Sequence, residues 1–270
     1  MIYIIYAPPR YGKTSLMAHI LNYFAFDKER IRNMRNEIKE KNLNGFNLTI
    51  PQHCVAANFD CTFHKYRYAP RKNRRINPYR LGFDNPYVKT HFSLPYEVYG
   101  ITEAQKYFNS RMSLYYPDWQ SRYIEAHGHD HLDFFLDTHR PILIDPNVRD
   151  LAKFIEVIKL DKKYDNFGRI IQMIWTIRVM DNSRTWEKYE NSGKTDKTCY
   201  TEHKIVADYD VFSIYNSFEC KPKFYNGHLN HDFDLQYSQG IEDTYDGYIK
   251  YLKENDDELP DKFYIKRSDK

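Results

Sequence analysis

The sequence predicts an α/β fold in which a largely parallel β-sheet is flanked by helices. Through residue 160, apolar runs typical of strands alternate with segments that have helical spacing of apolar residues, which favours parallel strands joined by helices. The 270 residues suffice for one large α/β domain, alone or with an appendage. With 41% hydrophobic and 29% charged residues, the composition is that of a globular protein. Ligands of such a sheet bind at the carboxyl ends of its strands.

The first strand and helix enclose a phosphate-binding pattern. Residues 2–6 (IYIIY) predict the strand, residues 7–11 (APPRY) a loop, and Gly12-Lys13-Thr14 the start of a helix. A glycine, four residues and Gly-Lys-Ser/Thr between strand and helix is the P-loop of NTPases, although Ala7 stands here at the first glycine. Alanine can leave the strand if its φ stays negative, and Gly12 allows a phosphate to approach the backbone. We therefore predict a P-loop NTPase fold that binds ATP through Pro9, Arg10, Tyr11, Gly12, Lys13, Thr14 and Ser15.

Hydrolysis of ATP needs further groups at the end of a buried strand. Lys13 is expected to reach the β- and γ-phosphates, and the Thr14 hydroxyl to hold Mg²⁺. A second apolar run stops at Ile101 and is followed by Thr102 and Glu103, where an Asp-Glu pair usually stands. Glu103 is the candidate for orienting the attacking water, or else a carboxylate favoured by a helix N-terminus. Thr102 can accept a hydrogen bond from a Mg²⁺-bound water but carries no charge, which predicts weakened hydrolysis.

The strand predicted in FFLDTHRP ends in a third polar group. Thr138 and His139 are expected beside the P-loop strand, where His139 would sense the γ-phosphate; a simple turn before Pro141 is the alternative. Arg111 and Arg140 are candidates for an arginine that one subunit of a ring supplies to its neighbour. Arg111 is slightly favoured, and either can equally be a surface residue.

Three segments surround this predicted core of residues 1–160. Residues 64–92 are rich in Pro, Asn, Tyr and Arg and read as an insertion whose basic and aromatic side chains suit single-stranded DNA. A subunit interface or a solvated loop would explain the same composition. Residues 161–224 predict a β-rich extension that completes the domain and contains a hairpin at 164–180. Residues 225–270 predict a peripheral polar tail.

Other features point away from metal centres and membrane spans. Four cysteines without CxxC spacing indicate neither a disulfide framework nor a zinc knuckle. The HGHDH stretch at 127–131 favours a helix end over a zinc site, because Gly128 interrupts it. The most apolar later run, RIIQMIWTIRVM, is too short to cross a bilayer. The chain begins with its first strand, so no signal peptide is expected.

Taken together, four segments resemble the zonula occludens toxin (Zot) family. These segments are YIIYAPPRYGKTSLMAHILN, YGITEAQKYFNSR, GHDHLDFFLDTHRPILIDPNVRDLAKFIEVI and DVFSIYNSFECK, and the likeness covers roughly residues 1 to 220. The family comprises P-loop ATPases of filamentous phages within the FtsK–HerA group. The resemblance implies that Thr102 replaces the Walker B aspartate, Glu103 is the catalytic glutamate and His139 replaces a sensor glutamine.

The resemblance also implies a function and partners. It implies a viral P-loop ATPase that uses ATP and Mg²⁺ to drive virion assembly, DNA packaging or DNA extrusion, as a ring-shaped homo-oligomer. A nucleotide-gated assembly or adaptor protein with little or no hydrolysis is the alternative. Since this sequence shows no transmembrane segment, the expected location is the host cytoplasm. Phage membrane or coat proteins would then attach it at the inner face of the inner membrane.

Overall fold

The computed structural model describes residues 1–41, 53–63, 71–76, 78, 81, 94–111, 118–167, 170–208, 224–225 and 228–229. Its helices are α1 (Lys13–Ala25), α2 (Lys28–Lys41), α3 (Asp118–Ala126), α4 (Pro146–Asp150) and α5 (Ser183–Asn191), with 3-10 turns at Ala104–Lys106, Pro141–Leu143 and Lys197–Cys199. Its strands are β1 (Ile2–Tyr6), β2 (Val55–Ala57), β3 (Thr62–Phe63), β4 (Arg71–Lys72), β5 (Arg74–Arg75), β6 (Val98–Ile101), β7 (Asp133–Thr138), β8 (Ala152–Tyr164), β9 (Ile170–Met180), β10 (Thr201–Asp208), β11 (Phe224–Tyr225) and β12 (His228–Leu229).

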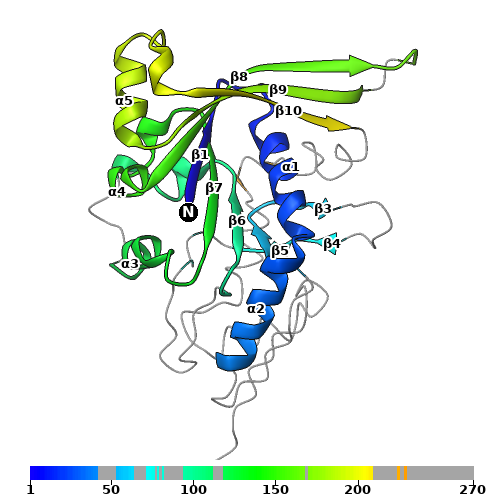
Figure 1. The fold of residues 1–270 in the computed structure, drawn as a ribbon, viewed down its shortest axis with the longest axis vertical. Helices are drawn as coiled ribbons and strands as arrows, with labels where there is room; N and C mark the ends of the chain where they lie inside the picture. The colour runs from blue at the N-terminus through cyan, green and yellow to red at the C-terminus, as the bar shows by residue number, and fades with distance from the viewer. Residues whose placement is uncertain are drawn as a thin grey trace, which may run out of the picture.

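One sheet organises the molecule (Figure 1). Its strand order is β10-β9-β8-β1-β7-β6-β2-β5. The strands from β8 to β5 run parallel, and β9 and β10 add an antiparallel edge. This topology confirms the predicted α/β class with a largely parallel sheet. Because β1, β6 and β7 are parallel, the P-loop after β1 lies on the same side of the sheet as the carboxyl ends of β6 and β7.

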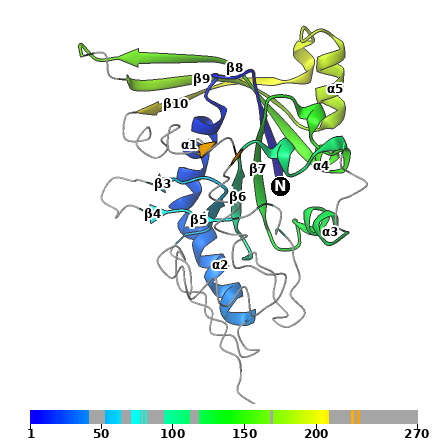
Figure 2. The ribbon, with the colours of Figure 1, turned by 180° about the vertical axis from the view of Figure 1, so that it is seen from behind.

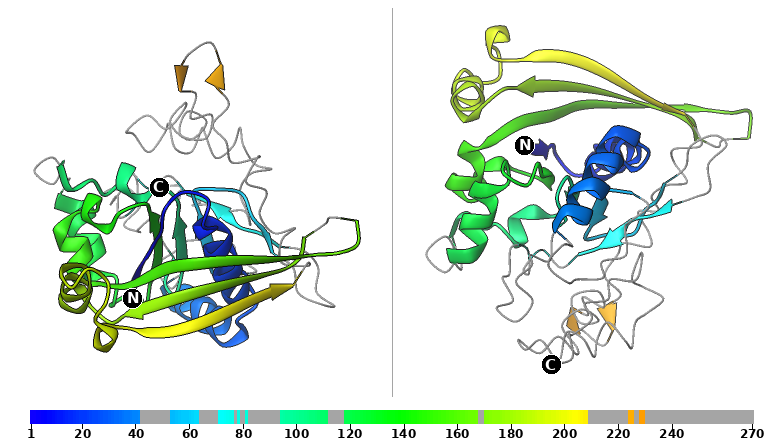
Figure 3. Two further views of the ribbon diagram at one scale, coloured as in Figure 1. Left: turned by 90° about the horizontal axis from the view of Figure 1, so that it is seen from above. Right: turned by 60° about the horizontal axis from the view of Figure 1, so that its bottom comes forward.

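Helices cover both faces of the sheet, as Figures 2 and 3 show from other directions. The IYIIY strand is buried on both sides, which explains its nearly continuous apolar sequence. Ile5 belongs to the core cluster that packs under α1 and α2, whereas Ile2, Ile4 and Tyr6 belong to the cluster under α3, α4 and α5. The alternation of side chains along β1 thus joins both helical layers to one sheet.

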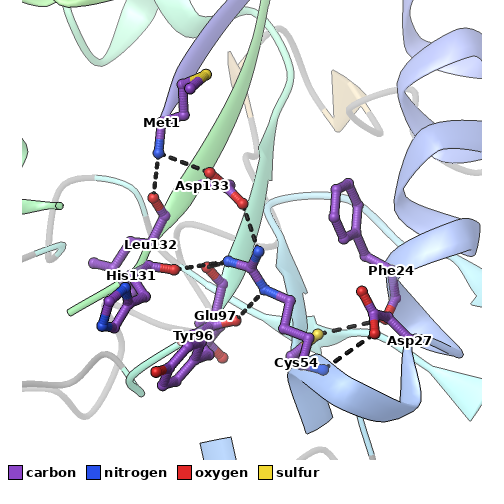
Figure 4. A network of polar contacts seen from close by, with 10 residues as sticks. Met1, Phe24, Asp27, Cys54, Tyr96, Glu97, His131, Leu132 and Asp133 are labelled. Carbon is purple, nitrogen blue, oxygen red and sulfur yellow. Dashed lines mark hydrogen bonds and ion pairs between the residues drawn. The ribbon is translucent and has the colours of Figure 1, made fainter. Parts of the chain in front are cut away.

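A polar network lies at the amino ends of β1 and β7, away from the P-loop (Figure 4). The amino terminus of Met1 donates to the Leu132 carbonyl and to Asp133, at 2.6 and 2.7 Å. Arg30 of α2 donates to the carbonyl of Tyr96 and to Asp133, both at 2.6 Å. The network therefore ties α2 and the chain start to the beginning of β7.

The region after residue 160 differs in part from its prediction. The hairpin is confirmed, since β8 pairs with β9 on either side of the predicted turn, but β8 runs across the predicted boundary at 160. The polar stretch before residue 209 reads as a loop from the sequence, yet it contains α5 and β10. Asn182 and Thr185 form a capping box at the start of α5, a signal that the apolar pattern alone does not reveal.

One more predicted element differs in the structure, and several predicted segments fall on residues that the structure does not describe. The segment LPYEVYGITEAQKYFNSRM predicts a strand followed by a helix, but a 3-10 turn follows β6. Residues 209–217, most of the 64–92 insertion and nearly all of the 225–270 tail lie outside the described residues. Within the part of the chain that is described, the helices are all too short or too polar to span a bilayer.

Candidate nucleotide-binding site

The loop from Ala7 to Gly12 presents the N-terminus of α1 without a side-chain cap. Arg10 and Gly12 both have left-handed backbones, with φ of 70° and 71°. Ala7 is buried and is not among the described residues with positive φ, which meets the condition under which alanine can replace the first glycine. Among the described residues, no side chain caps the start of α1, and its first turn carries no acidic residue. Unpaired amides at a helix N-terminus are an anion-binding arrangement.

Lys13, the first residue of α1, is buried inside this loop. Its Nζ lies 3.5 Å from the Pro8 carbonyl oxygen and 3.1 Å from Nδ1 of His139. Burial lowers the pKa of Lys13, whereas the charges of Asp137 and Glu103 favour its protonated form. A buried ammonium group held at a helix N-terminus is suited to binding a phosphate.

Asp137 is a carboxylate of this site that the sequence analysis missed. It lies near the end of β7, is 1% exposed, and accepts a 2.7 Å hydrogen bond from the Thr14 hydroxyl. Its second oxygen accepts from the backbone N–H of Glu103 at 2.9 Å. Burial raises the pKa of Asp137, and these two hydrogen bonds oppose that rise. A signal was present in the sequence, since Asp137 is a charged residue inside the apolar run FFLDT.

Glu103 and His139 lie side by side beyond Asp137. Glu103 has φ of 52°, and such strained backbones are concentrated at functional sites. Its Oε1 lies 3.5 Å from Nε2 of His139, and its Oε2 accepts from the Gln105 amide at 2.7 Å. Because Lys13 can only donate, Nδ1 of His139 must accept, which places the ring proton on Nε2, facing Glu103. Lys13, His139 and Glu103 therefore form one chain of polar contacts.

Thr102 is hydrogen-bonded to Asn58. Its backbone N–H donates to Oδ1 of Asn58 at 2.8 Å, and its hydroxyl lies 3.3 Å from the same oxygen. Asn58, which follows β2, returns a hydrogen bond from its amide nitrogen to the Thr102 carbonyl. Among the described residues, the carboxylate bonded to Thr14 is that of Asp137. A carboxyl group therefore lies at the end of β7, the strand next to β6, which Thr102 follows.

The remaining predicted residues lie at the surface or outside this contact chain. Pro9, Arg10 and Tyr11 are exposed, and Ser15 is half-buried in the first turn of α1. Arg111 and Arg140 are both exposed, as an arginine offered to a second subunit must be. In the described ranges, no group of three His, Cys, Asp or Glu side chains is arranged to hold a metal ion, including at 127–131.

Two arginines of the basic insertion have partners within the fold. Arg71 donates to the Ala25 carbonyl at the end of α1 at 2.8 Å. Arg74 forms a two-pronged ion pair with buried Glu97, at 2.7 and 2.5 Å. Both side chains stabilise the fold, and the charge of Arg74 is neutralised by that of Glu97.

Comparison with solved structures finds a zonular occludens toxin domain and a viral genome-packaging NTPase. The N-terminal domain of zonular occludens toxin from Neisseria meningitidis aligns over 80% of this chain and 98% of its own, with 17% identity and a TM-score of 0.48. The genome-packaging NTPase B204 of Sulfolobus turreted icosahedral virus 2, in complex with ATP-gammaS, aligns over 75% and 96%, with 10% identity and a TM-score of 0.32. No family model matches the chain, and the search of curated proteins finds no match. The likeness to zonula occludens toxin that the sequence suggests is thus also found among solved structures.

Proposed function

We propose that this protein is a viral P-loop ATPase that couples ATP binding and hydrolysis to virion assembly, DNA packaging or DNA extrusion. The observation that carries the proposal is the gathering of Lys13, Thr14, Asp137, Glu103 and His139 at the uncapped N-terminus of α1. These five side chains come from three separate segments of the chain. Together they supply a phosphate cradle, two oxygen ligands and a carboxylate for water.

Each residue has a role that follows from its contacts. The amides of Gly12 to Ser15 and the Lys13 ammonium bind the β- and γ-phosphates and stabilise the charge that develops on them. The Thr14 hydroxyl and the Asp137 carboxylate are oxygen donors, the kind that Mg²⁺ prefers, so they would hold a Mg²⁺ that neutralises phosphate charge. Glu103 orients and deprotonates the attacking water.

His139 has a positioning role in this proposal. Without nucleotide it accepts from Lys13 and faces Glu103. When Lys13 turns to a γ-phosphate, the His139 ring is released to contact that phosphate too. An exposed arginine of a neighbouring subunit, Arg111 or Arg140, would complete the site in a ring.

A nucleotide-gated adaptor with little hydrolysis is the second candidate. Two observations favour it: position 102 is uncharged, and burial raises the pKa of the Asp137 carboxyl that would take over. In this case ATP binding alone would change the conformation of the protein and its affinity for partners.

Phosphate release from ATP by the purified protein, with Mg²⁺ and with or without single-stranded DNA, separates the two functions. The ATPase proposal expects turnover that Lys13→Ala and Glu103→Gln abolish and that Glu187→Gln, an exposed control on α5, leaves unchanged. Nucleotide binding without turnover under any of these conditions would favour the adaptor. Protein that binds no nucleotide at all would overturn both candidates.

The partners remain proposals as well. We propose a homo-oligomeric ring, contact with DNA through residues 64–92, and association with phage coat or membrane proteins at the inner membrane of the host. A DNA contact predicts an affinity that falls steeply with salt. Because Arg71 and Arg74 support the fold, its test should use Lys65→Ala and the exposed Lys72→Ala instead.

A further inference from the structure

Two side chains of the β8–β9 hairpin lie directly against the P-loop. A Cβ added to Gly12 would stand 2.9 Å from Cδ2 of Leu160 and 3.0 Å from Nε1 of Trp175. Cε2 of the same indole is farther, at 3.9 Å, so the nitrogen edge of Trp175 faces the loop. Leu160 and Trp175 are paired across the two strands, which places them over Gly12 together. Figure 1 shows the hairpin passing the N-terminal end of α1.

The indole nitrogen of Trp175 is buried without an acceptor. Trp175 is 1% exposed, and within the described residues its Nε1 has no hydrogen-bond partner. His19, on the next turn of α1, stacks against the indole with ring centroids 6.1 Å apart, and its buried Nδ1 also has no partner. An N–H donor buried without an acceptor costs about 1–3 kcal/mol. The indole N–H of Trp175 can therefore donate to an acceptor that binds beside Gly12.

We propose that the indole N–H of Trp175 donates a hydrogen bond to a phosphate oxygen of the nucleotide held by the P-loop. This inference rests on the proposed function, because it assigns a further ligand to the same site. The donor faces the glycine that precedes Lys13, where the unpaired amides of α1 already favour an anion. A phosphate oxygen has free lone pairs, whereas the apolar neighbour Leu160 offers none. Trp175 thus adds to the cradle a donor from β9, far along the chain from residues 9–15.

The test measures nucleotide affinity with a probe that has the phosphates and with one that lacks them. Trp175→Phe keeps an aromatic ring but removes the N–H, and we expect it to weaken AMPPNP binding about tenfold, because a hydrogen bond to a charged group is lost. Trp186→Phe is the matched control, since Trp186 of α5 is also buried but stacks on Phe154, on the other face of the sheet. Lys13→Ala provides the reference for loss of phosphate binding.

A second measurement uses the wild-type protein, because misfolding of Trp175→Phe would also weaken nucleotide binding. The chain has 3 tryptophans, and their indole ¹H–¹⁵N signals can be assigned with Trp119→Phe and Trp186→Phe. The Trp175 signal should move downfield with AMPPNP and with pyrophosphate, and stay in place with adenosine alone.

The outcomes separate this inference from the proposed function. Weaker AMPPNP binding by Trp175→Phe, together with a shifted Trp175 indole signal, supports the inference. Nucleotide binding that depends on Lys13, with an unshifted Trp175 signal, overturns it and leaves the ATPase proposal standing. Protein that fails to bind AMPPNP overturns the proposed function and this inference together.

Discussion

The Thr14 hydroxyl donates a 2.7 Å hydrogen bond to Oδ2 of Asp137, which joins the first turn of α1 to the end of β7. A carboxylate in this position is costly, because Asp137 is 1% exposed and burial raises its pKa. A cation held by the oxygens of these two residues would offset that cost. We therefore assign to Asp137 the charge that Thr102 lacks on the neighbouring strand, as part of the proposed ATPase site.

Asp137→Asn should slow ATP hydrolysis and stabilise the folded protein. Asparagine can accept from the Glu103 amide and donate to Thr14, so the fold is kept, but the charge for Mg²⁺ is lost. We expect hydrolysis to fall about 100-fold or more, as when one electrostatic stabiliser is removed. Phosphate release at saturating Mg²⁺ measures this. Thr102→Val, which keeps its backbone bond to Asn58, should change the rate less than about threefold. A larger loss from Thr102→Val than from Asp137→Asn would contradict the assignment.

The stability of Asp137→Asn should depend less on pH than that of the wild type. Because the pKa of Asp137 is raised above its ordinary 3.8, the folded protein holds this proton more tightly than the unfolded chain does. The corresponding stability is present below pH 3.8 and is lost as the pH rises through the folded-state pKa. Nucleotide-free Asp137→Asn should therefore unfold at higher urea concentration than the wild type at pH 7, with little difference near pH 3. Equal midpoints at both pH values would argue against a buried charged Asp137.

Glu103→Gln should separate ATP binding from hydrolysis. Glutamine keeps the size of the side chain and a possible contact with Gln105, but it cannot take a proton from water. We expect turnover to fall at least 100-fold, with the Kd for ATP changed less than about threefold. Isothermal titration and phosphate release on one preparation measure the two quantities. If Glu103→Gln hydrolyses ATP at the wild-type rate, Glu103 is not the residue that activates the attacking water.

The fold class and several site residues were within reach of sequence reasoning because the signals are local. The IYIIY run, the loop and the Gly-Lys-Thr pattern are contiguous, and the order of strands and helices predicts a parallel sheet. In such a sheet Glu103 and His139 end neighbouring strands, β6 and β7, so their proximity followed from topology. Their catalytic roles remain predictions.

Other features depend on contacts that no local pattern encodes. The register of β1 against β7 sets Asp137 beside Ile5 and thereby on the α1 side of the sheet, within reach of Thr14. Trp175 reads simply as one apolar residue of a buried strand; its place over Gly12 depends on how β9 pairs with β8. Long-range pairing decided these two cases. α5 is different: its polar, mixed-charge sequence favours a loop, and the local Asn-Thr capping box at its start is the signal for a helix.

Gly12→Ala should be far more damaging than the same change at Gly193. Both glycines have left-handed backbones, with φ of 71° and 63°. A Cβ on Gly12 would collide with Leu160 and Trp175, at 2.9 and 3.0 Å, whereas one on Gly193 would meet nothing within 4 Å. Gly193→Ala should lower the free energy of unfolding by about 1 kcal/mol from backbone strain alone. Gly12→Ala should cost about 1–3 kcal/mol more and abolish nucleotide binding. Urea unfolding and AMPPNP titration test this; similar losses for both variants would show that the hairpin does not pack against the loop.

Arg74→Ala tests whether the basic insertion serves the fold. Glu97 is 2% exposed and accepts from Arg74, from the Tyr99 hydroxyl at 2.6 Å and from the Leu94 amide at 3.1 Å. Removing the arginine leaves a buried carboxylate without its cation, which should lower the free energy of unfolding by about 3–5 kcal/mol.

Two further variants identify the source of that loss. Lys72→Ala, exposed in the same segment, should change the free energy of unfolding by less than about 0.5 kcal/mol. Combining Arg74→Ala with Glu97→Gln should recover part of the stability, because the orphaned charge is gone while the hydrogen-bond acceptor remains. Recovered stability in the double variant, together with unchanged DNA affinity, would mean that Arg74 acts within the fold. If Arg74→Ala is instead as stable as the wild type and its salt-dependent DNA binding is weaker, Arg74 contacts DNA.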